Sequence, residues 1–148
     1  MNKSDYFCGV IKYTYIMETS NFKKLNVWQK SSDLTLALYE TSKKFQKKDN
    51  NLATQLVDCG ITMTGKIALA GELWSMDQKI TNLEIANEKV FNGISLLNLS
   101  ERLEILEPDH VKELESQFLD ISHALLSWIR NCNKKLPDNQ PEEQKAVE

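Results

Sequence analysis

The sequence predicts an all-α protein, an antiparallel up-down-up-down bundle of four helices. Glycine and proline together make up only eight of the 148 residues, so turn signals are few. Apolar residues recur at steps of three and four along four long segments, which is the period of an amphipathic helix. No strand-like alternation of any length follows residue 20. Because the segments between the helices are short, consecutive helices should pack antiparallel.

The bundle is expected over residues 22–135 as one domain. Residues 1–21 fit no period, and two interpretations stay open: this segment is a flexible arm, or the start is mis-called and Met17 is the true initiator. In the second case residues 1–16 are not translated. The segment 136–148 holds two prolines and mostly charged or amide residues, and we expect it to be a disordered tail.

The first helix is expected over residues 26–47. The Asp-Asn-Asn run at 49–51 supplies the break and an N-cap for the second helix, which runs to about Trp74 or Ser75. The core-facing stripe of this second helix consists of Leu52, Leu56, Cys59, Met63, Ile67, Ala70 and Trp74.

Ser75 or Asp77 can cap the third helix, which is expected to end near Leu106. Its stripe holds Ile80, Leu83, Val90, Ile94 and Leu97, with a glycine inside it at Gly93. Pro108 suits the first turn of the fourth helix, which runs to about Asn133. The core seam of this last helix consists of Val111, Leu114, Phe118, Ile121, Leu125, Trp128 and Cys132.

The second and fourth helices each carry further apolar residues away from the core seam. Val57, Ile61 and Ala68 lie almost opposite the first stripe of the second helix, and Leu119 and Leu126 lie outside the seam of the fourth. A helix in a small solvated monomer needs one apolar stripe. We therefore expect these five residues to form the oligomer interface of a homo-oligomer.

The composition bounds the class of protein. No apolar run is as long as a membrane span, so we expect no membrane partner. The three cysteines cannot all pair with one another, and Cys59 and Cys132 sit in core stripes, which is typical of buried thiols in a reducing cytoplasm. The net charge of −3 hides an asymmetry, because residues 1–48 hold nine lysines against four acidic residues. A basic site would therefore be local.

Such a basic site is expected where the first helix begins and the fourth ends. In an up-down-up-down bundle these two termini are neighbours. Their cations could bind a protein partner, or they could contact the phosphates of a nucleic acid. A ring of subunits would carry one such patch on each subunit. Lysines at helix ends are also explained by the helix dipole and by solubility. The candidate residues are Lys23, Lys24, Lys30, Arg130, Lys134 and Lys135.

No enzyme is expected. Asp120 and His123 have a metal-ligand spacing, but both lie more than about 100° from the seam of the fourth helix, so we expect no metal site. No Ser-His-Asp, P-loop or dinucleotide-binding pattern is present, and we expect no cofactor and no small-molecule substrate. Both histidines are expected to be exposed. The three tryptophans are expected to be core or interface residues, not exposed stacking platforms for bases.

Several segments resemble a bacterial family of four-helix bundle proteins, related to the protein encoded in large-subunit (23S) rRNA intervening sequences. The opening Leu-Asn-Val-Trp-Gln-Lys-Ser run at 25–31 is similar to the start of the family's first helix. Leu-Glu-Ile-Ala at 83–86 and Leu-Leu-Ser-Trp-Ile-Arg at 125–130 resemble its third helix and its closing segment. The likeness covers roughly residues 22–135 and extends to the accessory variability determinant protein of diversity-generating retroelements.

This resemblance implies a four-helix bundle, often assembled as a pentamer, and in the retroelement branch a reverse transcriptase and its RNA as partners. The chain departs from the family where Val57 and Asp58 replace paired arginines, which removes phosphate-binding donors. At residues 62–70 the family's proline and glutamate are missing. We therefore expect a non-catalytic accessory scaffold that binds a protein, an RNA or both. The alternative is a pure protein–protein adaptor without nucleic-acid binding.

Overall fold

The computed structural model describes residues 21–45 and 47–137. Within these residues the chain forms four α-helices and two short 3-10 helices, and no strand. These elements are η1 (Phe22–Lys24), α2 (Asn26–Ser42), η2 (Lys47–Asp49), α3 (Asn50–Glu72), α4 (Met76–Arg102) and α5 (Pro108–Asn133). The all-α bundle predicted from the sequence is confirmed. The expected arm and tail lie outside the described residues, except for Asn21, Leu136 and Pro137.

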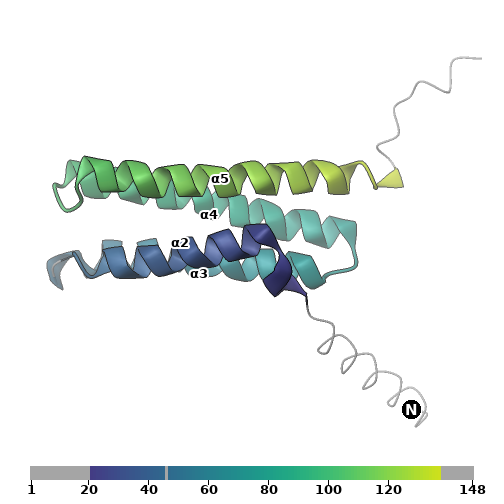
Figure 1. Cartoon of the computed structure of the whole chain (residues 1–148), viewed down its shortest axis with the longest axis horizontal. Coiled ribbons are helices and arrows are strands. Elements are labelled where there is room, and N and C mark those ends of the chain that lie inside the picture. The colour runs from purple at the N-terminus through teal and green to yellow at the C-terminus, as the bar shows by residue number, and fades with distance from the viewer. Residues whose placement is uncertain (1–20, 46, 138–148) are drawn as a thin grey trace, which may run out of the picture.

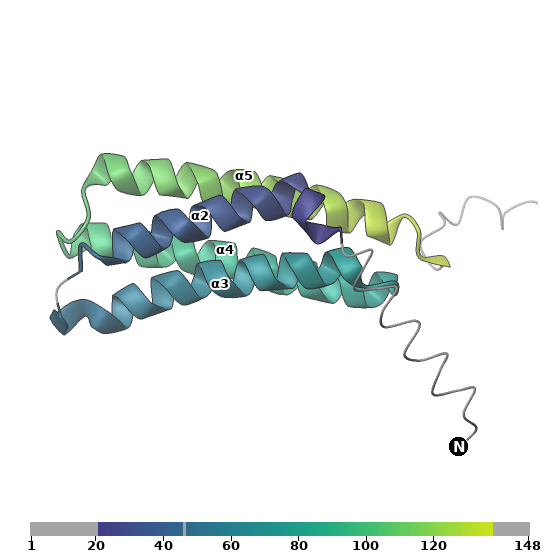
Figure 2. The ribbon, with the colours of Figure 1, turned by 60° about the horizontal axis from the view of Figure 1, so that its bottom comes forward.

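The helices are arranged in the order of the chain around one core. α2 packs against α3 and α5, and α4 packs against the same two helices. Short connections over 73–75 and 103–107 link α3 to α4 and α4 to α5, so these neighbours run in opposite directions. Figures 1 and 2 show the consequence: the start of α2 and the end of α5 lie at the same end of the bundle, together with the α3–α4 connection.

The core follows the predicted stripes, except that Leu52 and Ile80 are only half-buried. Fully buried leucine, isoleucine, valine and methionine side chains from all four helices form one cluster with Phe118. A glycine marks a close approach in each half of the bundle. A Cβ atom on Gly93 would lie 2.3 Å from Phe118 Cζ, and one on Gly60 would lie 2.8 Å from Thr35 Oγ1. Gly93 therefore belongs in the α4 stripe because the Phe118 ring of α5 fills the space of a side chain.

The predicted helix starts agree with the structure. α2 begins at Asn26, and Ser75 caps α4 by accepting a hydrogen bond from the Gln78 N–H at 3.4 Å. Pro108 begins α5. Asp49 occupies the N-cap position of α3, although its side chain accepts no capping hydrogen bond.

Two predicted helix ends are wrong. α2 ends at Ser42, not Lys47, because the chain tightens into i→i+3 turns there: the Phe45 N–H donates to the Ser42 carbonyl at 3.1 Å. α4 ends at Arg102, four residues before Leu106. Glu104 turns into the left-handed region with φ 58°, and the Ile105 N–H returns to the Ser100 carbonyl at 3.0 Å.

Two side-chain expectations are also corrected. Trp74 is 85% exposed, because it follows the last residue of α3 and stands in the connection to α4. Its place in the core stripe is therefore wrong, whereas Trp28 and Trp128 pack at the edge of the core as predicted. His110 is half-buried, not exposed, and its Nε2 lies 2.8 Å from Thr41 Oγ1. Among the described helices, none has the length and hydropathy needed to cross a bilayer.

Candidate functional site

The cations singled out from the sequence gather at the end of the bundle where α2 begins and α5 ends (Figure 1). All six side chains are exposed. Because cations near one another on an exposed surface attract polyanions, this end is the candidate partner site. We call this set the basic end: Lys23, Lys24, Lys30, Arg130, Lys134 and Lys135.

The lysine pair of η1 stands on a backbone that is fixed from three sides. The Glu72 carboxylate, at the end of α3, accepts hydrogen bonds from the N–H groups of Asn21 and Phe22, both at 3.0 Å. The Gln29 amide of α2 donates to the Lys23 carbonyl at 2.9 Å. The Phe22 ring meets Trp28 edge to face at 5.1 Å between centroids. Lys23 and Lys24 are therefore presented on ordered backbone close to the end of α3.

Lys79 of α4 connects α3 and α5 at the basic end. Its ammonium group, on α4, donates to the Ala70 carbonyl of α3 at 2.9 Å. It also lies 5.9 Å from the ring centroid of Trp128 on α5. The first contact satisfies a carbonyl in the last turn of α3, and the second is a cation–π contact. Lys79 is a structural cation here, since its charge is already engaged.

The three cations of α5 follow one another around the last turn of the helix and beyond. Lys134 and Lys135 continue it as a turn, with N–H groups donating to the carbonyls of Arg130 and Cys132 at 3.1 Å each. Cys132 is buried and holds this turn against the core. Cations in this position also interact favourably with the helix dipole.

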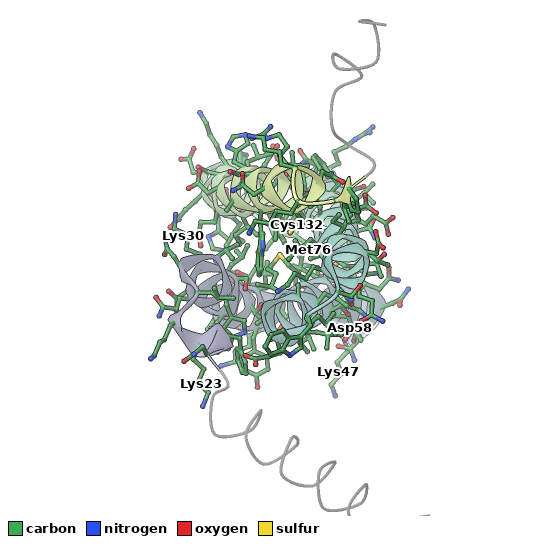
Figure 3. All side chains as sticks on the ribbon, turned by 90° about the vertical axis from the view of Figure 1, so that its right-hand side faces the viewer. Lys23, Lys30, Lys47, Asp58, Met76 and Cys132 are labelled. Carbon is green, nitrogen blue, oxygen red and sulfur yellow. The ribbon has the colours of Figure 1, made fainter. Side chains whose placement is uncertain are left out.

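Lys30 differs from the other five. It lines a hollow of 200 Å³ between α2 and α5, together with Asp33, Gln117 and Asp120. Figure 3 looks onto the basic end and shows Lys30 on the flank of α2 that faces α5, with Lys23 on the far side of α2. Two carboxylates beside Lys30 partly neutralise its charge, so it contributes least to the positive potential of the set.

The five residues expected at an oligomer interface lie outside the core of the bundle. Ile61 is 56% exposed, Leu119 38% and Leu126 39%, while Val57 and Ala68 are half-buried. Residues of an oligomer interface must be accessible on the monomer, and these residues are. The interface itself stays a prediction. The reason for the exposure is local, because these residues point away from the seam that each helix turns toward the core.

Each group of interface residues lies on a different side of the bundle. Gly60 packs on Thr35, so the next residues, Ile61 and Leu36, turn outward together over the α2–α3 pair; Leu36 is 63% exposed. We call this the Ile61 face: Leu36, Val57, Ile61 and Ala68.

The second face lies over the α4–α5 pair. Gly93 packs on Phe118, and Ser122 Oγ donates to Asn87 Oδ1 at 2.7 Å. These two contacts fix how α4 and α5 face each other. Helix periodicity then places Phe91 of α4 and Leu119 of α5 on the same outer side of the pair. Phe91 is 52% exposed. We call this the Leu119 face: Phe91, Leu119 and Leu126. Because α2–α3 and α4–α5 are opposite pairs in the helix order, the two faces are on opposite sides of the bundle.

A polar groove of 460 Å³ runs between α3 and α4. Cys59 contributes a thiol, a potential nucleophile, to this groove. Burial raises the pKa of the thiol above its ordinary value, which keeps it protonated at neutral pH. Asp58 lies on this groove as well. The groove is lined by Gln55, Asp58, Cys59, Thr62, Lys89, Asn92, Ser95 and Leu96.

Metal-ligating side chains are dispersed in the part of the chain that the structure describes. Asp120 and His123 are exposed on the outer side of α5, as the helical wheel predicted. Over residues 21–45 and 47–137, no three His, Cys, Asp or Glu side chains lie close enough to hold a metal ion.

Four residues with a structural role or high exposure at the basic end were not predicted as site residues: Gln29, Glu72, Trp74 and Lys79. Trp74 could have been found from the sequence, because the N-cap signal at Ser75 already places the preceding residue in a connection. The contacts of Glu72 and Lys79 join different elements across up to 51 residues of sequence, so no local pattern predicts them, whereas Gln29 reaches a carbonyl only six residues away.

Comparisons with known proteins agree with this architecture. A family model described as 23S rRNA-intervening sequence protein matches residues 23–127. A crystal structure at 1.70 Å of a protein with unknown function from the S23 ribosomal protein family of Bacteroides thetaiotaomicron is 21% identical, with a TM-score of 0.67. The match covers 70% of this chain and 98% of that one, and it supports the fold alone. No curated protein matches the chain. On the strength of the family model, the chain belongs to the 23S rRNA-intervening sequence protein family.

Proposed function

We propose that this protein is a non-catalytic homo-oligomeric scaffold that binds RNA through its basic end. The observation that carries the proposal is the combination of two unlike apolar faces on opposite sides of the bundle with a cluster of exposed cations at one end. The faces explain assembly, and the cations explain partner binding. The two parts are supported separately and can be tested separately.

The faces favour a head-to-tail assembly. A contact of one face with the same face of a second copy would leave the other face in water. A contact of the Ile61 face with the Leu119 face of the next copy buries both, and such a heterologous contact closes into a ring when the rotation permits. The five-subunit ring implied by the family resemblance is one such assembly.

A ring would also concentrate the charge. In a cyclic assembly every subunit has the same orientation relative to the symmetry axis. With that axis near the helix direction, all basic ends lie on one side of the ring. The potential of several such clusters adds, which raises the local concentration of a polyanion such as RNA.

Two variants test the assembly. Leu126→Glu places a charge on the Leu119 face, and Ile61→Glu places one on the Ile61 face. The matched control is Ser127→Glu, which introduces the same charge at the neighbouring exposed residue of α5, away from the face. By light scattering at micromolar concentration, wild type and Ser127→Glu should be oligomers of one size, and each face variant should be a monomer.

Mixing the two face variants distinguishes head-to-tail from face-to-face contacts. Each variant retains one intact face, and the intact faces differ, so a one-to-one mixture should form a heterodimer and stop there. Face-to-face contacts predict instead that each variant dimerises by itself through its remaining face. A wild-type monomer at micromolar concentration would refute the oligomer outright.

RNA binding is tested by its dependence on salt. Affinity of a labelled single-stranded RNA, measured by fluorescence anisotropy, should fall steeply between about 50 and 200 mM salt, because cations on the protein replace counterions on the phosphates. Lys23→Gln with Lys24→Gln should lower the slope of log affinity against log salt by about 1.4, roughly 0.7 for each lost phosphate contact. The control pair is Lys44→Gln with Lys47→Gln, exposed lysines at the other end of the bundle.

Binding that is independent of salt, or that both lysine pairs change equally, would overturn RNA binding at the basic end. A protein–protein adaptor is the alternative. It predicts partner binding without a steep salt dependence, and a wild-type protein that shows no affinity for RNA.

A further inference from the structure

Trp74 is the most exposed large hydrophobic side chain among the described residues, with 85% of its surface open to solvent. It stands in the three-residue connection between Glu72, the last residue of α3, and Met76, the first of α4. Ser75 then caps α4, so the connection has a defined conformation. An indole held this far into water gains nothing for the fold, since burial of apolar surface is what stabilises it.

The connection lies at the basic end (Figure 2). Two residues before Trp74, the Glu72 carboxylate holds the N–H groups of Asn21 and Phe22 at 3.0 Å, which brings η1 and its lysine pair next to the connection. A Cβ atom on Gly71 would lie 3.4 Å from Phe22 Cβ, so the two segments are in contact there. Lys23 and Lys24 therefore belong to a segment that contacts the last turn of α3, three residues before the exposed indole.

Lys79 connects the same place to α5. It binds the carbonyl of Ala70, four residues before Trp74, and lies over the ring of Trp128. Arg130 follows that ring in the last turn of α5, and Lys134 and Lys135 come just after the helix. Trp74 thus lies at the same end of the bundle as two groups of exposed cations, which are contributed by different elements. Of the nearby carboxylates, Glu72 is engaged by backbone N–H groups, while Asp77 is exposed.

We propose that Trp74 is a stacking platform for an unpaired base of a single-stranded RNA whose phosphates bind the basic end. This inference rests on the proposed RNA-binding function and adds to it the strand state of the RNA and the residue that detects it. Bases in single-stranded RNA can splay out and stack on aromatic side chains, whereas bases within a duplex are already stacked. The exposed lysines at the same end of the bundle supply the phosphate contacts that such platforms combine with.

The surroundings favour a base over a protein surface. The core of a protein–protein interface is made of several apolar side chains together. The neighbours of Trp74 in the chain are the half-buried Leu73 and the exposed Ser75, and the cations of the basic end lie at the same end of the bundle. A flat aromatic ring among positive charges is complementary to a base attached to a phosphate backbone.

The test compares Trp74→Ala and Trp74→Phe with wild type, using labelled oligouridine and an RNA duplex of equal length as probes. Trp74→Ala should weaken binding of oligouridine by roughly tenfold or more, with duplex affinity nearly unchanged, because stacking on one base is lost. Trp74→Phe should recover most of the affinity. The slope of log affinity against log salt should stay the same in both variants, since stacking releases no counterions.

Tryptophan fluorescence gives a second readout. Oligouridine should quench part of the wild-type emission, and that part should disappear in Trp74→Phe, where Trp28 and Trp128 remain. Because Trp74 is exposed, thermal unfolding of the variants should match that of wild type.

The possible failures are distinguishable. Salt-dependent RNA binding that Trp74→Ala does not weaken overturns the stacking role and leaves the proposed function intact. Wild-type protein without RNA affinity overturns both. A change in particle size by light scattering in Trp74→Ala would make the indole an intersubunit anchor, and retained RNA binding with loss of a protein partner would make it a protein contact; either result refutes base stacking.

Discussion

The two ends of the bundle carry similar numbers of lysines but use them differently. At the basic end the cations are mostly unopposed, and the carboxylate of Glu72 is occupied by backbone N–H groups. At the other end, lysines alternate with acids. There Lys43 forms an exposed pair with Glu40 at 2.8 Å, and this hydrogen bond raises the pKa of the lysine. We call the second set the mixed end: Glu40, Lys43, Lys44, Lys47, Asp49, Glu101, Arg102, Glu104, Glu107, Asp109, Lys112 and Glu113.

This difference in charge between the two ends indicates that partner binding is expected at the basic end. Balanced charges at the mixed end serve solubility, and surface ion pairs add little to stability. At the basic end, long-range hydrogen bonds fix the backbone while leaving the lysine ammonium groups free. Four substitutions sharpen or break this contrast, in order of decreasing effect.

The largest effect is expected for Glu72→Ala. The N–H groups of Asn21 and Phe22 lose a charged acceptor, which should lower the free energy of unfolding by about 2 kcal/mol. Hydrogen exchange at these two amides should also accelerate. The matched change at the mixed end, Glu40→Ala, should leave the unfolding curve nearly unchanged. Equal effects at both ends would remove the distinction between them.

A somewhat smaller loss is expected for Lys79→Met, which retains most of the apolar stem. The Ala70 carbonyl loses its donor and the Trp128 ring loses its cation, and together these cost about 1.5 kcal/mol. Chemical denaturation measures the difference. A variant as stable as wild type would show that the three helix ends meet without this contact.

At the mixed end, the corresponding long-range contact joins Thr41 of α2 to His110 of α5 at 2.8 Å. Thr41→Val keeps the shape of the side chain and removes the hydroxyl. The expected loss is about 1 kcal/mol, the value of one hydrogen bond in a part-buried site. Thr41→Ser, which keeps the hydroxyl, should recover the hydrogen bond but not the packing of the methyl group.

The smallest effect is a gain. Glu104 holds a left-handed conformation with φ 58°, which costs a residue with a Cβ about 1 kcal/mol. Glu104→Gly removes that strain and, after the larger entropy of the unfolded glycine, should stabilise the protein by about 0.5 kcal/mol. Leu103→Gly is the control, because Leu103 has φ −83° and should lose stability. A thermal shift of the opposite sign in Glu104→Gly would contradict the assignment of strain.

Much of this fold could be predicted because an amphipathic helix repeats its signal many times. Leu56, Met63 and Ile67 share one period, so a single ambiguous residue does not change the assignment. Caps and prolines added the starts of α4 and α5. Helix ends were predicted less well, since the end at Ser42 depends on backbone turns and not on a residue type that forbids helix.

The candidate site was predicted in part. The six cations could be grouped from topology alone, because a four-helix bundle with short connections brings the first and last termini together. Of the two acidic neighbours of Lys30, Asp33 lies three residues further along the same helix, but Asp120 could not be foreseen because it comes from another helix. Trp74 was misplaced because its stripe was continued past the residue where the hydrogen-bonded helix stops.

By itself, the sequence determined the fold class, the core stripes and the location of the cations, because these depend on periodicity and on the direction of each helix. Tertiary structure alone decided that Glu72 fixes the backbone of η1 and that Lys79 is engaged by Ala70 and Trp128. Those facts depend on distances between helix ends. Such distances follow from how four complete helices pack against one another, and no local segment encodes them.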